Sequence, residues 1–423
     1  MRDRYETVKK EYESLKALHL TLDMSRGKPG EEQLDLSNPM LEALSSGDFR
    51  TEAGADCRNY GGLDGIPEMK RIFADILDVG ADEVIVGGNS SLAMMFDCLT
   101  ACAEYGAGLE GISWRDQGRI KFLCPAPGYD RHFSICEYLR IEMIPVAMKD
   151  DGPDMDQVEK LARADPMIKG MWCVPVYSNP TGCVYAPETV RRLARLCPAA
   201  RDFRLFWDNA YGVHAFAEER PRIPNILREC EEAGCPELPL IFTSLSKVSF
   251  AGAAVAAAAC SKTNRKAILR RAALETPSGP DKLNQLRHVR FFQNAEGVYR
   301  HMEKMAALIR PKFDAALDAL DRRLSSRLAG GKSAAMWTKP KGGYFISVYT
   351  ADGCAARTVA LCREAGVVLT PAGAAYPYGL DPKDSHIRLA PTYPAVADLL
   401  RAMEVFCVSL ELAALEKQIF AIQ

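Results

Sequence analysis

The sequence predicts an α/β fold, with a large domain built on a mostly parallel seven-stranded sheet flanked by helices and a smaller α+β domain. Seven short, continuous apolar runs are typical of strands that helices cover on both faces. Helical stretches lie between several of these runs, and that alternation favours parallel pairing through right-handed crossovers. After about residue 285 the alternation gives way to a long, charged, helix-like segment and shorter strands, which indicates the second domain.

The individual elements follow from the same patterns. Helices are expected at residues 91–105, 155–164 and 187–196, with Ser90 as the N-cap of the first and Pro187 near the first turn of the third. Strands of the large sheet are expected at residues 84–87, 120–124, 141–146, 170–176, 203–207, 240–244 and 253–259. Beyond them we expect a helix-like segment at 286–320 and strands near 343–348 and 367–369. We place the large domain at residues 46–309 and the small domain at residues 1–45 and 310–423.

Composition narrows the class of function. The 423 residues carry a formal net charge of −2, which gives no reason to expect nucleic acid or a membrane surface as a partner. The longest nearly uncharged small-apolar run, residues 250–260, is shorter than the roughly 20 residues of a membrane span. The charged N-terminal stretch lacks the apolar segment of a secretory signal.

Cysteine usage indicates the compartment. The 14 cysteines are scattered without a C-x-x-C pair, and many lie inside apolar runs, as expected of buried thiols in a reducing cytoplasm. The six histidines do not cluster with them at the spacing of metal ligands. The sequence therefore predicts a cytoplasmic protein without a metal site.

Unusual polar residues follow four of the expected strands. They are Tyr129, Asn179, the pair Asp208 and Tyr211, and Lys247. Ligands of open parallel sheets bind beyond the carboxyl ends of the strands, so these side chains are expected to meet at one edge. Each has a simpler explanation by itself: a turn for Asn179, a helix cap for Asp208, a core position for Tyr129 and a surface amine for Lys247. Their coincidence at one edge favours a site, in which Lys247 could form a Schiff base with a carbonyl cofactor.

Four motifs carry a family resemblance: Asn179-Pro-Thr-Gly182, Asp208-x-x-Tyr211, Ser244-x-Ser-Lys247 and His386-Ile-Arg388-Leu-Ala-Pro. In this order and spacing the chain resembles the class I aminotransferases of pyridoxal-phosphate fold type I, from about residue 22 to residue 394. Residues 23–29 and 279–288 are most similar to a bacterial subgroup of aspartate aminotransferases. The resemblance implies pyridoxal 5′-phosphate as the cofactor.

The resemblance also implies roles for the residues at the strand ends. Lys247 would hold the cofactor aldehyde and then move the proton of the substrate Cα. Asp208 would pair with the pyridine nitrogen and keep it protonated, so that the ring can accept electrons. Asn179 and Tyr211 would donate hydrogen bonds to the phenolic oxygen of the ring.

Three further residues would complete the ring and carboxylate contacts. Tyr129 would stack on the ring face, and His132 would orient Asp208 from behind. Arg388 would bind the α-carboxylate of the substrate as a two-pronged donor, a geometry that a lysine reproduces poorly. Without the other motifs, Arg388 could equally be a surface arginine beside a turn.

The phosphate end has weaker support. Residues 87–91 lead from a strand into a helix, where free N–H groups and the helix dipole face an anion; the expected contacts are Asn89, Ser90, Ser91 and Ser244. Tyr60 matches a tyrosine that reaches the phosphate of the neighbouring subunit, so a homodimer with shared active sites is expected. Most relatives place a phosphate-binding arginine seven residues after the lysine, where this chain has Ala254. Another cation, or serines and backbone amides alone, could take its place.

Substrate choice is the least determined property. The resemblance favours L-aspartate and 2-oxoglutarate, giving oxaloacetate and L-glutamate, with Gly27 and Lys28 joining Arg388 and Asn179 at the substrate. A side-chain carboxylate needs a second cation, for which Arg26, Lys28, Arg131 and Lys282 are candidates, although solvated surface positions are the usual fate of such residues.

Other functions use the same fold. An aminotransferase of different specificity, a cysteine-conjugate β-lyase or a decarboxylase would need the same residues. An aminotransferase-like regulator would need an N-terminal DNA-binding domain, and only some twenty residues precede the first motif. A protein that kept the fold without catalysis is disfavoured by the presence of Lys247, Asp208, Tyr211, Asn179 and Arg388 together.

Overall fold

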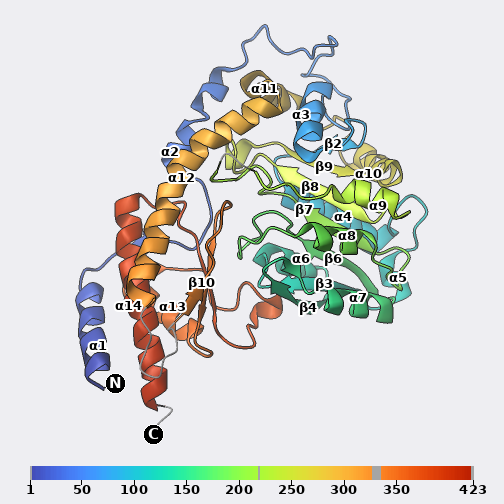
Figure 1. Ribbon diagram of the computed structural model, residues 1–423. Helices are drawn as coiled ribbons and strands as arrows, with labels where there is room; N and C mark the ends of the chain where they lie inside the picture. Colours follow the sequence, from blue (N-terminus) through green and yellow to red (C-terminus); the bar gives the residue numbers. More distant parts are fainter. Residues whose placement is uncertain (1, 218–219, 326–334, 421–423) are drawn as a thin grey trace.

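The structure is a computed structural model that describes residues 2–217, 220–325 and 335–420 (Figure 1). Its centre is an eight-stranded sheet in the order β2-β9-β8-β7-β6-β3-β4-β5. In chain order these strands are β2 (Val84–Val86), β3 (Lys121–Ala126), β4 (Glu142–Lys149), β5 (Gly152–Pro153), β6 (Ile168–Cys173), β7 (Arg204–Asp208), β8 (Pro239–Ser244) and β9 (Ala256–Cys260). The five strands from β8 to β4 are parallel neighbours, and β9 runs antiparallel to both of its neighbours.

All seven predicted strands are present, and the mostly parallel α/β fold is confirmed. The eighth strand, β5, has two residues and pairs antiparallel with β4, too short to leave a pattern in the sequence. The predicted strand 170–176 runs too far, because the ladder ends at Cys173. Val174 and Val176 are apolar for another reason: they are buried against the core of the smaller part of the molecule. The predicted strand 253–259 begins too early, because residues Ala251–Ala253 form a 3-10 turn, η2.

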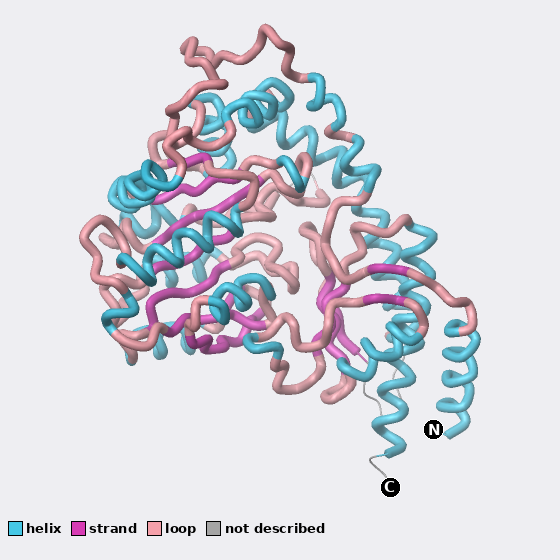
Figure 2. The backbone as a smooth tube through the Cα atoms, turned by 180° about the vertical axis from the view of Figure 1, so that it is seen from behind, coloured by secondary structure: helices cyan, strands magenta, loops and turns pink. Residues whose placement is uncertain are grey.

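Helices cover both faces of this sheet (Figure 2). Alternate strand residues face opposite sides: Leu205 and Trp207 of β7 belong to one apolar cluster, and Phe206 between them belongs to another. The first cluster packs against α3 (Pro67–Leu77), α7 (Met155–Ala164), α8 (Pro187–Ala194) and α9 (Ile226–Glu232). The second packs against α4 (Ser91–Tyr105), α5 (Trp114–Gln117), α6 (Asp130–Tyr138) and α10 (Lys262–Glu275). Burial on both faces explains why the strands read as continuous apolar runs.

The smaller part is built from the two ends of the chain. Its strands form a three-stranded antiparallel sheet, β10 (Ala335–Trp337), β11 (Ile346–Thr350) and β13 (His386–Leu389), and a parallel pair, β1 (Leu22–Asp23) and β12 (Val367–Val368). The helices are α1 (Arg2–Lys16), α2 (Glu31–Asp35), α13 (Ala355–Glu364) and α14 (Val396–Phe420), with a 3-10 turn η3 (Pro377–Gly379). A further 3-10 turn, η1 (Asn38–Glu42), packs through Met40 into an apolar cluster of the large sheet. One apolar cluster joins α1, α13 and α14. The division at residues 1–45 and 310–423 stays a prediction.

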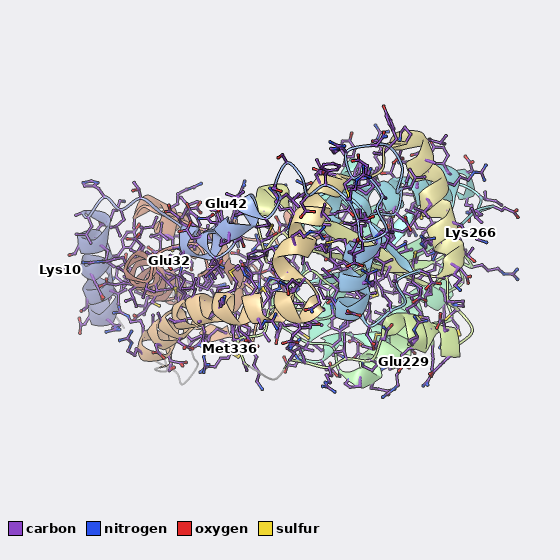
Figure 3. The ribbon with its side chains drawn as sticks, turned by 90° about the horizontal axis from the view of Figure 1, so that it is seen from above. Lys10, Glu32, Glu42, Glu229, Lys266 and Met336 are labelled. Carbon is purple, nitrogen blue, oxygen red and sulfur yellow. The ribbon has the colours of Figure 1, made fainter. Side chains whose placement is uncertain are left out.

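The helix-like segment predicted at 286–320 is two helices. They are α11 (Lys282–Phe292) and α12 (Ala295–Leu324), separated by Gln293 in a left-handed conformation with φ of 67°. Asn294 caps α12 by accepting a hydrogen bond from the Gly297 N–H at 3.0 Å. The prediction missed this break because polar Gln and Asn do not interrupt a charged helical pattern. Seen from above, Lys10 on α1 and Lys266 on α10 mark opposite ends of an elongated molecule (Figure 3).

Membrane helices, metal clusters and disulfides were considered among the described residues. None of the helices in the described ranges has the length and apolar character needed to cross a membrane. Within those same ranges, no group of three or more His, Cys, Asp or Glu side chains is placed to hold a metal ion. All 14 cysteines are free thiols, and most are buried.

Candidate active site

The polar residues at the strand ends converge on one cavity. A space of about 800 Å³ is lined by Tyr129, Asn179, Tyr211, Lys247 and Arg388. The first four follow strands β3, β6, β7 and β8 of the large sheet, and Arg388 comes from β13 of the small part. The cavity therefore lies between the two parts of the molecule, at the carboxyl ends of the parallel strands.

Asp208 occupies the end of β7 and is 4% exposed. Its Oδ2 lies 3.1 Å from Nε2 of His132, which is buried on α6. The His132 ring stacks on Trp172 of β6, with ring centroids 4.2 Å apart and planes 6° from parallel. This stack holds the imidazole against the Asp208 carboxylate. Sequence reasoning found His132 and missed Trp172, which looks like any core residue of a strand.

Lys247 follows β8 and reaches the cavity with its amine. The Nζ lies 4.9 Å from the ring centroid of Tyr211 and 5.8 Å from that of Tyr344. Among the residues that the structure describes, no carboxylate lies within ion-pair distance of this amine. Its backbone oxygen accepts a hydrogen bond from the Tyr344 hydroxyl at 3.5 Å and lies 3.3 Å from Nε2 of His214. The main chain is thus held while the amine stays free.

Burial shifts the pKa of three titratable side chains near Lys247. Burial, with the nearby charge of Lys247, lowers the pKa of His214 to about 3. Burial raises the pKa of Tyr129 to about 12, against the opposing effect of Lys247. Burial also raises the pKa of Tyr211, and Arg388 and Asn179 oppose that rise. Both phenols can therefore donate hydrogen bonds at neutral pH.

Arg388 is 8% exposed and lies across the cavity. Its Nη1 donates to Asp130 Oδ1 at 2.8 Å and to Asn179 Oδ1 at 3.3 Å, and its Nη2 donates to Thr370 Oγ1 at 3.2 Å. The guanidinium lies 4.9 Å from the ring centroid of Phe345. Asp130 and Thr370 were not predicted as site residues. The sequence offered an indication only for Asp130, because it directly follows the predicted residue Tyr129.

Two buried donors at this point have no acceptor in the structure. They are Nε of Arg388 and Nδ2 of Asn179. An unpaired buried N–H is costly, so each indicates a place where an oxygen of a bound molecule belongs. A carboxylate facing Arg388, and a ring oxygen facing Asn179, satisfy them; the residues present therefore fit a carboxylate substrate and an oxygen-bearing ring.

The predicted phosphate contacts lie at the start of α4. Ser90 caps the helix, accepting a hydrogen bond from the Ala93 N–H at 3.3 Å, and Ser91 is its first residue. Asn89 is exposed, and its backbone oxygen accepts from the Ser246 hydroxyl at 3.1 Å. Ser244 is buried at the end of β8. Of these four predicted residues, Asn89 lines a second cavity, of about 620 Å³, together with Ala254.

Arg287 of α11 lines that second cavity beside Asn89 and Ala254. Its Nη2 donates to Asn284 Oδ1 at 2.6 Å, and Asn284 Nδ2 donates to the backbone oxygen of Ala254 at 2.9 Å. The buried Nε of Arg287 has no acceptor in the structure. Arg287 was not predicted as a site residue, because it lies 33 positions away from Ala254 on a helix of ordinary composition.

Of the four cations predicted as contacts of a side-chain carboxylate, three line the main cavity and Lys282 does not. Arg26, Lys28 and Arg131 line the main cavity, together with Arg363, which sequence reasoning missed. Gly27 lines it too: a Cβ there would lie 2.4 Å from Cζ of Phe345, so only glycine allows this close approach.

The remaining predicted residues lie outside both cavities. Tyr60 is 79% exposed. Its loop packs beside Lys282, since a Cβ on Gly62 would lie 3.4 Å from the Cδ of Lys282. Tyr60 and Lys282, far apart in the sequence, thus occupy one surface of the molecule and make no contact with the main cavity of their own chain.

Comparison with known proteins shows the family of this chain. A family model described as aspartate amino-transferase matches residues 1–421. The chain is a class I aminotransferase of pyridoxal-phosphate fold type I. It is 46% identical to a Mycolicibacterium smegmatis protein named as an aminotransferase, over 98% of this chain and 96% of the relative. It is 44% identical to an aspartate aminotransferase of Corynebacterium glutamicum, over 97% of this chain and 94% of that protein.

Solved structures agree with this assignment. The crystal structure of an aspartate transaminase from Corynebacterium glutamicum aligns with a TM-score of 0.93 at 44% identity, covering 98% of this chain and 96% of the other. An α-aminoadipate aminotransferase from Thermus thermophilus, complexed with N-(5′-phosphopyridoxyl)-L-leucine, aligns with a TM-score of 0.74 at 20% identity, covering 95% and 94%. At that identity the second likeness shows only a shared fold.

Proposed function

We propose that this aminotransferase uses pyridoxal 5′-phosphate to transfer the amino group of L-aspartate to 2-oxoglutarate, giving oxaloacetate and L-glutamate. The observation that carries the proposal is that a free amine, Lys247, and a buried guanidinium, Arg388, line one cavity, while the buried carboxylate of Asp208 ends the neighbouring strand β7. The aspartate aminotransferase of Corynebacterium glutamicum, 44% identical, supports the substrate pair.

Residues on both sides of the cavity would hold the cofactor. Lys247 would bind it covalently, Tyr129 would stack on the ring, and Asn179 with Tyr211 would donate to the ring oxygen. Asp208 is buried and positioned by His132, so its carboxylate would keep the ring nitrogen protonated. The bound cofactor supplies an electron sink that makes the Cα proton of an amino acid acidic.

Lys247 is placed to move that proton. Its Nζ has no ion-pair partner in the described parts of the chain and sits over the Tyr211 ring, inside a cavity that the substrate shares. The free amine would take the proton from Cα and return it to the carbon on the other side of the amino nitrogen, acting as base and then as acid. Tyr344 and the backbone hydrogen bonds keep the residue in place during both steps.

Arg388 would bind the α-carboxylate. Its unpaired Nε and its Nη2 offer two donors along one edge of the guanidinium, the geometry of a bidentate carboxylate contact. Asp130 holds the opposite edge through Nη1 and orients the arginine, at the cost of part of its charge. Asn179 links this contact to the ring end, because its Oδ1 also accepts from Nη1.

The charge of the cavity supports a dicarboxylic substrate. Six basic residues line it (Arg26, Lys28, Arg131, Lys247, Arg363 and Arg388), against Asp130 as its one acidic residue in the described part of the chain. After one cation is assigned to the cofactor and one to the α-carboxylate, four solvent-exposed cations remain in the lining of the cavity. Such an excess attracts dianions more strongly than neutral amino acids.

The phosphate would lie at the start of α4, with Asn89, Ser90, Ser91 and Ser244 as donors. We propose that Arg287 supplies the positive charge absent at Ala254, since Asn284 ties it to that position and its Nε has no acceptor. Tyr60 and Lys282 share one exposed surface, which supports a homodimer in which they reach the partner's site. Fourteen free thiols support a place in the reducing cytoplasm.

A panel of amino donors tests the proposed function. The purified enzyme is loaded with pyridoxal phosphate, and kcat/KM is measured for aspartate, glutamate, alanine, phenylalanine and cystathionine with 2-oxoglutarate as acceptor. We expect kcat/KM for aspartate to exceed that for alanine and phenylalanine by roughly 10–100-fold, since a second carboxylate contact adds roughly 1.5–3 kcal/mol. Faster turnover of alanine or phenylalanine would overturn the substrate, and pyruvate release from cystathionine without an acceptor would indicate a β-lyase.

A further inference from the structure

A third cavity lies on the far side of the large sheet from the active site. It has a volume of about 520 Å³ and lies between α4 and α10. Its walls are largely apolar, with Ala101, Leu109, Leu240, Ala267, Ile268 and Leu274 among them. Lys266 on α10, at the end of the molecule away from α1, marks this region in Figure 3. Cavities of this size, apolar with a few polar groups, are typical of small-molecule sites.

Among the charged side chains that line this cavity in the described part of the chain, one is buried. Arg204, the first residue of β7, is 6% exposed. Its guanidinium donates to the backbone oxygen of Phe203 at 2.9 Å and to Asn264 Oδ1 at 3.5 Å. No carboxylate of residues 2–217, 220–325 or 335–420 lies within 4 Å of it. A buried charge without a counter-ion is costly, and an arginine cannot escape the cost by losing its proton.

The neighbouring carboxylate is occupied elsewhere. Asp202, two residues before Arg204, accepts from Lys169 Nζ at 2.8 Å and from Gln117 Nε2 at 2.8 Å. At the rim, Arg271 pairs with Glu275 at 3.1 Å, so that this acid is neutralised as well. Asp202 and Glu237 act on Arg204 from beyond ion-pair distance, and neither carboxylate contacts its guanidinium.

The two thiols of this cavity and Arg270 at its rim supply no negative charge to pair with Arg204. Cys98 and Cys102 contribute their thiols to its wall. Burial raises the pKa of both thiols, that of Cys102 to about 12, so both stay protonated at neutral pH. Arg270 at the rim is exposed and adds further positive charge.

We propose that this cavity binds an amphipathic monocarboxylate, whose apolar chain lies between α4 and α10 and whose carboxylate pairs with Arg204. The apolar walls provide the site for the chain, and the buried guanidinium provides the counter-charge. The site is distinct from the active site: Arg204 and Asp208 stand at opposite ends of β7, about 13 Å apart at the rise of a strand. The two cavities have no lining residue in common.

Calorimetric titration of the holoenzyme with hexanoate and with 1-hexanol tests the carboxylate contact. The two probes share an apolar chain and differ in charge, so we expect saturable binding of hexanoate and at least tenfold weaker binding of hexanol, as for the loss of one charge-assisted contact. Arg204→Met should weaken hexanoate binding at least tenfold. Lys266→Met is the matched control. Lys266 lies on α10 outside the cavity, so this variant removes one positive charge and should leave hexanoate binding unchanged.

Two further variants locate the site. Ala267→Phe fills the cavity without altering its charge, and it should abolish binding even if Arg204→Met folds poorly. Arg388→Met, which removes the carboxylate contact of the active site, should leave hexanoate binding intact. Absence of saturable binding to the wild-type holoenzyme, unchanged affinity in Ala267→Phe, or loss of binding in Arg388→Met would overturn the proposal.

Discussion

The two ends of the candidate cofactor site differ in how completely their polar groups are held. At the Asp208 end, the carboxylate is buried and faces His132, which in turn stacks on Trp172. At the start of α4, Asn89 is exposed, and the cavity beside it is lined by Arg287, whose Nε lacks an acceptor. At the Asp208 end the polar groups contact each other within one chain, whereas at the α4 end a donor is left without an acceptor.

This difference separates the residues that we expect to control the reaction rate from those that we expect to control cofactor affinity. Groups that must keep one protonation state are fixed by burial and stacking, because small movements there change the pKa. Groups that only neutralise a phosphate can be supplied by any nearby cation, so the arginine missing at Ala254 can be replaced from another helix. Variants at the Asp208 end should therefore change rate, and variants at the α4 end should change cofactor affinity.

The largest effect is expected for Lys247→Ala. Loss of the amine removes both the covalent attachment and the proton transfer, and kcat should fall by roughly 10³-fold or more. The fold should persist, because the amine has no ion-pair partner among the described residues. Turnover and thermal unfolding are measured together. Retained turnover in this variant, next to a Lys266→Ala surface control, would contradict the mechanism.

Asp208→Asn should reduce kcat by roughly 10²–10³-fold, the range for loss of one preorganised electrostatic group. The amide has the shape of the carboxylate and cannot hold a proton on the ring nitrogen. His132→Gln acts through Asp208 and should cost less in kcat while shifting its pH profile. Equal and small effects of both variants would show that the Asp208 end does not control the rate.

Arg388→Lys should lower kcat/KM by roughly 10–100-fold for every amino acid, because a lysine provides a point charge in place of a fork. Arg363→Gln provides the comparison, since it should lower kcat/KM for aspartate and leave alanine unchanged. Steady-state kinetics with both donors separates the two. An equal loss for aspartate and alanine in Arg363→Gln would remove that residue from the side-chain site.

Arg287→Met should weaken pyridoxal phosphate about tenfold, the cost of one charge-assisted contact, and leave kcat at saturating cofactor within about twofold. Cofactor affinity is measured by fluorescence titration of the apoenzyme. Arg290→Met is the matched control: Arg290 lies one turn along α11 and pairs with Asp48 outside the cavity. If both variants bind the cofactor as tightly as wild type, the phosphate depends on serines and backbone amides alone.

The smallest effect concerns stability. The pKa of His214 is lowered to about 3 from its ordinary 6.5. Above pH 6.5 both folded and unfolded forms are neutral, and below it the unfolded chain binds the proton more tightly. Stability from this group is therefore lost as the pH falls from 6.5 towards 3, by at most about 1.4 kcal/mol per pH unit. His214→Gln should reduce the drop in unfolding free energy between pH 7.5 and 5.5 by about 1 kcal/mol, measured by urea titration; an unchanged drop would contradict the assignment.

The sequence sufficed to place polar residues that directly follow a strand. Asn179, Asp208, Tyr211 and Lys247 were predicted together because parallel strands bring their carboxyl ends to one edge. It did not suffice for Asp130, Thr370, Arg287 and Arg363, whose contacts join segments far apart in the chain.

Similar limits applied to the fold. The apolar periodicity predicted seven strands, but it could not distinguish Val174 and Val176, buried beneath the small domain core, from residues of the ladder. The helix break at Gln293 depends on one left-handed residue and a capping Asn294, which a charged pattern conceals.

One measurement tests the central claim most directly. The enzyme is incubated with pyridoxal phosphate, reduced with borohydride, digested and mapped by mass spectrometry. We predict that the phosphopyridoxyl group is found on Lys247 and on no other lysine, because this amine lies in the cavity with Asp208 and Arg388 behind it. An unmodified Lys247, or a label on Lys28 or Lys282 in its place, would contradict the account.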